Sequence, residues 1–160
     1  MNIFILDKAP KLCAQYHCDK HVIKMILETA QMMCTVLSSQ GFKTPYRPTH
    51  ANHPCTLWLQ ESSGNWKWAL KMVEFLDNEY MYRYNKELSH ASMTVIRSLE
   101  EPSFPKKNRT KFAQAMPSCY QDPSDPITAY RNYYYNDKKN ICTWTKRGKP
   151  KWFSILEADS

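Results

Sequence analysis

Apolar residues recur at helical spacing along most of the chain, and the longest such stretch covers residues 10–39. This stretch contains no Gly, has a Pro only at its first position, and is followed closely by Gly41. Pro is tolerated at the first position of a helix because that residue has no intrahelical N–H bond to lose, and Gly often follows the last turn. The pattern therefore predicts one long N-terminal helix over 10–39, on which the fold is built.

The predicted helix has two different faces when its residues are placed 100° apart. Two imidazoles, an ammonium and a carboxylate within about three turns are an unusual set for a face that only needs to be soluble. Asp19 lies on the apolar side, so we expect it to be paired or hydrogen-bonded. The apolar face carries Val22, Ile23, Met25, Ile26, Thr29, Met33 and Val36, and the polar stripe carries His17, His21, Lys24, Glu28 and Gln31.

The remaining periodicity predicts a mainly α fold in one compact domain, 1–160. Only three Gly occur, too few for many tight hairpins. The apolar segment 2–6 is expected to pack beside the long helix, as a short strand, and to bring the N-terminus close to it. Further helices are predicted over 54–62, 65–88, 90–99 and 126–141, with a proline-rich loop over 100–125 and a basic, aromatic tail over about 143–160.

Charge and composition favour a polyanion as partner. The net charge is +7, and no apolar run approaches the roughly 18 residues that a membrane span needs. The start, MNIFILDKAP, lacks the basic region of a signal peptide. None of the six Cys forms a C-x-x-C pair, so we interpret them as reduced thiols of a protein in the cytoplasm, or in the host cytoplasm if the protein is viral.

The polar stripe supplies the candidate catalytic residues. A Glu near Lys or His acts as a general base or stabilises a cationic transition state, with no cofactor. Glu28 is the predicted carboxylate, and a nearby amine is the predicted nucleophile. The candidate set is Glu28, His21, Lys24, His17 and the amine of Met1.

A zinc site is an alternative use of the same histidines. His17 and His21 are four residues apart, and His53 of the loop could complete a ligand set. No dense Cys/His cluster supports this, so no metal is predicted. Contact of His50 and His53 with phosphate, or packing of both over the helix, is favoured instead.

Cations interleaved with aromatic residues predict contact with DNA, because cations meet phosphates and rings stack on bases. The alternative is a tyrosine-rich helix in the core followed by a poorly ordered basic tail. The predicted nucleic-acid-binding residues are His50, His53, Arg131, Lys138, Lys139, Trp144, Lys146, Arg147 and Lys149.

Three of these features together resemble, distantly, the pyrimidine-dimer DNA glycosylase/AP-lyase family of the phage endonuclease V type. The chain has Asp19-Lys20-His21 with Glu28 seven residues after the His, where that family has an Asp-x-His and its catalytic Glu. The stretch VEFLDNEYMYRYN is similar to the family's middle helix, and Thr143-Trp144-Thr145-Lys146 to its aromatic, basic end. Leu27 and Gln31 replace the basic residues that flank the family's Glu.

The resemblance implies a compact helical bundle with its N-terminus inserted between helices, and an N-terminal amine as nucleophile. The leading prediction is a glycosylase-like enzyme that cleaves or modifies a nucleobase in DNA, in a small phage or large-DNA-virus protein. Three alternatives stay open: a non-catalytic binder of nucleic acid or nucleotide, a transferase that modifies bases of viral DNA, and a metal-dependent hydrolase.

Overall fold

The computed structural model describes all 160 residues and contains seven α-helices and no β-strand. The predicted all-α fold is confirmed. None of the helices has the length and apolar composition needed to cross a membrane. The helices are α1 (Pro10–Tyr16), α2 (Asp19–Ser39), α3 (Pro54–Glu61), α4 (Ser63–Arg83), α5 (Ala91–Ser98), α6 (Pro126–Lys138) and α7 (Lys151–Ala158), with 3₁₀ turns at Ser118–Tyr120 and Lys139–Ile141.

The predicted single helix over 10–39 is two helices, because the chain is extended at His17 and Cys18. Arg83 stabilises the break from α4. Its guanidinium donates to the carbonyl oxygen of His17 at 2.7 Å and to that of Gln15 at 2.8 Å. These carbonyls belong to the end of α1, where a helix leaves its acceptors unpaired. The first helix therefore ends because of a tertiary contact with Arg83, which the local sequence pattern does not predict.

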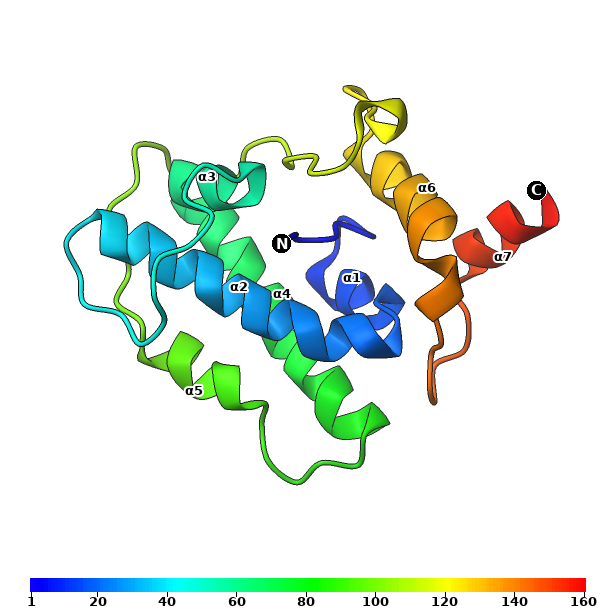
Figure 1. Cartoon of the computed structure of the whole chain (residues 1–160), viewed down its shortest axis with the longest axis horizontal. Coiled ribbons are helices and arrows are strands. Elements are labelled where there is room, and N and C mark those ends of the chain that lie inside the picture. The colour runs from blue at the N-terminus through cyan, green and yellow to red at the C-terminus, as the bar shows by residue number, and fades with distance from the viewer.

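The core lies where α2 crosses α4, with α3 and α5 packed around that crossing (Figure 1). Met25, Ile26 and Met33 of α2 are almost fully buried, as are Met72 and Leu76 of α4. Ile23, expected on the apolar face, is 36% exposed instead. It points away because the apolar face is narrower than the sequence pattern indicated.

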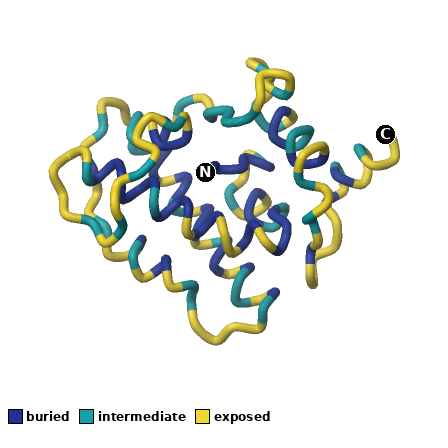
Figure 2. The backbone as a smooth tube through the Cα atoms, viewed as in Figure 1, coloured by how far each residue is buried: buried dark blue, intermediate teal, exposed yellow.

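The N-terminal segment is buried in the middle of the molecule, between the α2–α4 layer and α6 (Figures 1 and 2). Residues 2–6 are each at most 6% exposed, yet they form no strand. The predicted position beside the N-terminal helix is confirmed, and the predicted strand is wrong. Inserting this segment brings the start of the chain against α2.

Several helix boundaries differ from those predicted because of side-chain caps and strained turns. The predicted helix 65–88 begins two residues earlier, where the Ser62 hydroxyl accepts from the N–H of Asn65 at 3.0 Å. It ends before Asn85, which has a left-handed φ of 52°. The final predicted helix ends at Lys138 and continues as a 3₁₀ turn.

The C-terminal tail is ordered and forms α7, so the alternative of a poorly ordered tail is wrong. Phe153 of α7 is buried and meets Tyr135 of α6 edge to face at 5.2 Å between ring centroids. Edge-to-face aromatic pairs are favourable beyond the area that they bury. The aromatic residues of the tail therefore hold it against α6 instead of presenting it to solvent.

Candidate functional site

A small polar cavity of about 100 Å³ lies where the N-terminal segment meets α2 and α6. It contains three positively charged groups and one carboxylate, which is unusual for a space this small. Its lining residues are Met1, Asn2, Phe4, His21, Lys24, Met25, Glu28, Tyr133 and Lys138. Four of the five predicted catalytic residues, namely Met1, His21, Lys24 and Glu28, are thus brought together.

Glu28 is the centre of this cavity, and it is 8% exposed. One carboxylate oxygen, Oε2, accepts from the backbone N–H of Asn2 at 3.1 Å and lies 3.7 Å from the Met1 amine. The other oxygen, Oε1, lies 3.7 Å from Nζ of Lys24, one helical turn earlier. Glu28 is therefore surrounded by nitrogen atoms but makes only one close hydrogen bond.

The start of the chain is fixed through the side chain of Asn2. Its Nδ2 donates to the carbonyl oxygen of Ala115 at 2.7 Å, and its Oδ1 lies 3.0 Å from the hydroxyl of Tyr130. The Cys55 thiol approaches the same Oδ1 at 3.6 Å. Contacts from α3, α6 and the loop before α6 thus hold the amine beside the carboxylate.

His53, predicted to contact phosphate, lies beside the N-terminus instead of in a separate patch. Its Nδ1 caps α3 by accepting from the N–H of Cys55 at 3.0 Å. Burial lowers the pKa of His53, and the positive charge of the N-terminus lowers it further. A neutral imidazole close to the amine adds no positive charge that would compete for Glu28. His50 is exposed and bonds to Thr49 Oγ1 at 2.7 Å.

His21 is held rigidly at one wall of the cavity. Its ring stacks on Phe4, with 4.7 Å between centroids and 11° between planes. Its Nδ1 lies 2.8 Å from the hydroxyl of Tyr134, which also accepts from the N–H of Cys18 at 2.9 Å. When the tyrosine proton is donated to Nδ1, a neutral His21 carries its own proton on Nε2 and is a hydrogen-bond donor.

His17 does not join the other stripe residues, which corrects the expected single stripe. The break between α1 and α2 turns its imidazole into the core, where it is completely buried and its Nδ1 lies 2.7 Å from the carbonyl oxygen of Cys13. Burial lowers the pKa of His17 to about 4. No group of three or more His, Cys, Asp or Glu side chains is arranged to hold a metal ion. The metal-dependent hydrolase therefore has no ligand set to support it.

Most of the predicted DNA contacts near the C-terminus are occupied within the protein. Trp144 is 8% exposed, and its Nε1 donates to the carbonyl oxygen of Tyr16. Arg147 forms two bonds with Glu79, and Lys149 pairs with Glu157 at 2.8 Å. The further occupied cations are Lys146, bonded to Tyr82 and Asn85, Arg131, bonded to Leu6 and Asp7, and Lys139, over the ring of Tyr135.

Lys138 differs from the rest of that group because it lines the cavity. Its Nζ lies 5.4 Å from the ring centroid of Tyr133, which also lines the cavity. Lys138 and Tyr133 belong to the run of cations and aromatic residues that predicted contact with DNA, but no role at this cavity was predicted for Tyr133, Phe4 or Asn2. These residues come together only because the N-terminal segment inserts between α2 and α6.

Comparisons of the chain with protein-family models, with curated proteins and with solved structures find no match.

Proposed function

We propose that the protein is a glycosylase-like enzyme that acts on a nucleobase in DNA, with Glu28 as its carboxylate and an N-terminal amine as its nucleophile. The observation that carries the proposal is the distance of 3.7 Å between the Met1 amine and Glu28 Oε2 inside a lined cavity. The net charge of +7 suits a polyanionic substrate. The distant resemblance to the pyrimidine-dimer glycosylases, whose nucleophile is such an amine, agrees with this pairing.

The chemistry requires a nucleotide turned out of the base stack, since the sugar of a stacked nucleotide is not accessible to a recessed amine. The neutral amine would form a bond to C1′ of the sugar while the glycosidic bond breaks. The base would leave with the bonding electrons and take up a proton. The nitrogen would lose a proton to Glu28. The C1′–O4′ bond would then break with O4′ taking up a proton, which opens the sugar ring and leaves a protonated imine between C1′ and the amine.

Glu28 has two tasks in this scheme. Its negative charge stabilises the positive charge that develops on the sugar, and its oxygen accepts the proton that the amine loses. His21 and Lys138 are placed to donate hydrogen bonds to the departing base or to a phosphate. Phe4 and Tyr133 supply aromatic surface on the same walls.

The test is borohydride trapping on an oligonucleotide that contains one abasic site. Borohydride reduces the imine to a stable amine, so an enzyme with an amine nucleophile stays covalently attached to the DNA. We expect an adduct with the parent chain, none after a Gly-Ser extension is placed before Met1, and a persistent adduct with Lys24→Gln. Mass spectrometry of the adduct identifies the modified residue, including Asn2 if Met1 is removed.

A matched control is Glu74→Gln, which changes an exposed carboxylate on α4 that pairs with Arg97. This variant should trap DNA as the parent does. An adduct that is lost with Lys24→Gln but survives the extension would assign the nucleophile to Lys24. If the parent binds DNA but gives no adduct, the catalytic proposal is wrong.

The second candidate is a non-catalytic binder of nucleic acid or nucleotide, favoured by the excess of positive groups around the cavity. Met1, Lys24 and Lys138 surround a single carboxylate. Such a set attracts a phosphate without any need for chemistry. Binding without trapping would identify this function.

A further inference from the structure

A basic loop, residues 106–111, is bound by its backbone to the start of α4. The N–H of Ser63 donates to the carbonyl oxygen of Lys106 at 3.0 Å, and that of Gly64 to the carbonyl oxygen of Lys107 at 2.9 Å. The first N–H groups of a helix have no partner within the helix. The loop backbone therefore caps α4, and the charged side chains of the loop are left exposed.

Asn65 and Gly64 make this contact close. The Asn65 side chain accepts from the N–H of Thr110 at 2.8 Å and donates to its hydroxyl at 2.8 Å. A Cβ added to Gly64 would lie 2.3 Å from the backbone nitrogen of Arg109, far inside contact distance. The glycine is thus required for the loop to approach the helix.

Three of the four cations in the loop are free for a ligand. Lys106 pairs with Glu61 at 2.8 Å, whereas Lys107, Arg109 and Lys111 make no ion pair and are exposed. The Cζ atom of the Arg109 guanidinium lies over the ring of Phe112, 4.2 Å from its centroid. A guanidinium held in this way offers a flat, charged surface on which a base can stack.

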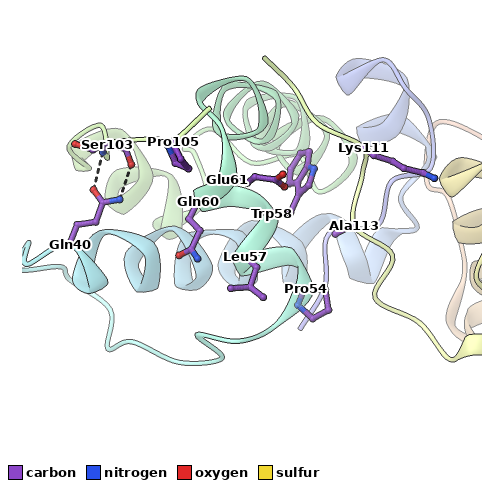
Figure 3. A pocket seen from close by; sticks show the side chains of 10 residues that line it. All are labelled: Gln40, Pro54, Leu57, Trp58, Gln60, Glu61, Ser103, Pro105, Lys111 and Ala113. Carbon is purple, nitrogen blue, oxygen red and sulfur yellow. Dashed lines mark hydrogen bonds between the residues drawn. The ribbon is translucent and has the colours of Figure 1, made fainter. Parts of the chain in front are cut away.

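A cleft of about 680 Å³, the largest in the protein, runs between this loop region and α3 (Figure 3). At its far end, the Gln40 amide bonds to the backbone of Ser103 at 2.8 and 2.9 Å, which ties α2 to the loop. Glu61 in the wall is already paired with Lys106, so no free carboxylate opposes an anion. Other lining residues include Pro54, Leu57, Gln60, Pro105, Lys111 and Ala113.

The near end of the cleft lies close to the residues that hold the N-terminus, although the cleft and the Glu28 cavity share no lining residue. Pro54 and Ala113 line that end, and both neighbour the contacts that hold Asn2. Cys55, next to Pro54, approaches the Asn2 side chain, and the Tyr130 hydroxyl lies 3.0 Å from both Asn2 Oδ1 and the Ala113 carbonyl oxygen. A chain lying in the cleft would therefore end close to the residues that fix Asn2.

We infer that this cleft binds a single strand of DNA that continues from the nucleotide in the Glu28 cavity, an inference that rests on the proposed function. Lys111, the free cation that lines the cleft, contacts a phosphate there, and Lys107 and Arg109 of the same loop contact phosphates outside the cleft. Leu57, the prolines and the Gln60 amide meet bases on the other. Apolar groups can lie against the faces of bases only where the strand is unpaired and unstacked, which favours a single strand over a duplex.

The test measures binding of a fluorescent single-stranded oligonucleotide by anisotropy at several salt concentrations. The double variant Lys107→Glu/Lys111→Glu should weaken binding by roughly tenfold or more, because two phosphate contacts are lost and two negative charges are added. The slope of log affinity against log salt should fall as well, since each phosphate contact of a single strand contributes about 0.7 to it. The matched control, Lys86→Glu, reverses an exposed charge in the α4–α5 loop on the opposite side of the molecule and should bind as the parent does (Figure 1).

Gly64→Ala tests the placement of the loop without changing any charge. We expect weaker binding of the single strand, while circular dichroism shows unchanged helix content. If this variant does not fold, the double lysine variant still decides the question.

Three results would overturn the inference: no binding of the single strand by the parent, equal binding by the parent and the double lysine variant, or tighter binding of duplex through the same two lysines. The binding assay needs no catalysis. If a strand binds through Lys107 and Lys111 but no borohydride adduct forms, the inference about the cleft stands and the proposed enzymatic function is wrong. If the adduct forms but the double variant binds as the parent does, the proposed function stands and the inference about the cleft is wrong.

Discussion

Two carboxylates on α2, Asp19 and Glu28, are equally buried but are used differently. Each is 8% exposed. Asp19 accepts from the N–H and hydroxyl of Thr145, the hydroxyl of Thr143 and the guanidinium of Arg83, at 2.7 to 3.2 Å. Glu28 accepts one hydrogen bond, at 3.1 Å, and its two ammonium neighbours stay at 3.7 Å. Asp19 has no capacity left for a ligand, whereas Glu28 has.

The surroundings of Asp19 explain why it stays charged. Burial alone would raise the pKa of Asp19, but the hydrogen bonds from Thr145 and Thr143, together with Arg83, hold the pKa below its usual value. The same Arg83 also pairs with Glu79 at 3.0 Å. Asp19 thus joins α2, α4 and the segment after α6, and its function is structural. Burial of a charge therefore identifies a candidate residue, and unused hydrogen-bonding capacity beside a cavity distinguishes a functional site from a structural contact.

The largest expected effect is on Glu28. Glu28→Gln keeps the size of the side chain and removes its charge, so folding should survive. DNA binding should be equal or tighter, because a negative charge near phosphate is gone. Trapping or base release should fall by roughly 100-fold or more, as expected when a charge-stabilising group is lost. Single-turnover kinetics on DNA with matched binding would measure this.

A Glu28→Gln variant that folds, binds and reacts at the parent rate would show that the cavity is not catalytic. The corresponding change at Glu74, on the exposed face of α4, controls for the loss of one carboxylate. In that event Glu28, like Asp19, would have only a structural role.

Asp19→Asn is expected to change stability and not chemistry. The substitution would remove the negative charge that faces Arg83, although Arg83 would still pair with Glu79. Loss of a hydrogen bond to a charged group in a buried position costs about 2 kcal/mol of unfolding free energy. Urea denaturation measures this directly. An unchanged unfolding midpoint would mean that the contacts of Thr143, Thr145 and Glu79 maintain the stability of the fold without the negative charge of Asp19.

The sequence predicted the difference between these carboxylates only in part. Asp19 was expected to be paired because it sits among apolar residues, and that prediction is confirmed. Its partners could not be predicted, since Arg83, Thr143 and Thr145 are more than 60 residues away and contact it only after α4 and the C-terminal segment pack. Periodicity records which face of a helix is apolar, but not which distant side chain will meet it.

The candidate site was predictable where residues share one helix. His21, Lys24 and Glu28 come together because residues three and four apart on a helix are neighbours. His17 was misplaced because the break before Asp19 comes from Arg83, a tertiary contact. The Phe4 stack and the Tyr133 wall also depend on insertion of the N-terminal segment. The Met1 amine was expected near Glu28 from the apolar character of residues 2–6, which requires that segment to be buried.

His17 gives a pH-dependent prediction that separates the core from the cavity. Its pKa is about 4 in the fold and 6.5 when unfolded, so the unfolded chain binds more protons between these values. The contribution to stability is present above pH 6.5 and is lost as pH falls toward 4. Between pH 7 and pH 5 the parent should lose roughly 2 kcal/mol through this group.

His17→Asn removes the titration while keeping a donor for the Cys13 carbonyl. The stability of this variant should therefore fall less between pH 7 and pH 5 than that of the parent, as measured by urea denaturation at both values. His53 and His90 also have pKa values lowered by burial, but they remain in both proteins and cancel in the difference. His50→Asn, at an exposed left-handed position that Asn tolerates, is the control. An equal loss of stability in the parent and His17→Asn would exclude His17 as the titrating group.

The smallest expected effect is on the C-terminal cations, which the sequence pattern favoured as a DNA contact. Lys146, Arg147 and Lys149 are each bonded to oxygen atoms of the protein, so binding phosphate would require those bonds to be broken. Replacing all three by Gln should lower affinity for DNA by less than about threefold and leave the salt slope nearly unchanged, since few counterions are released by cations that are already paired. Glu79 keeps Arg83 in this variant, so the fold should survive. Anisotropy titrations beside the Lys107→Glu/Lys111→Glu variant compare the two basic regions under the same conditions. A steeper loss from the tail variant than from the loop variant would assign the main phosphate contact to the tail and leave the cleft as a secondary surface.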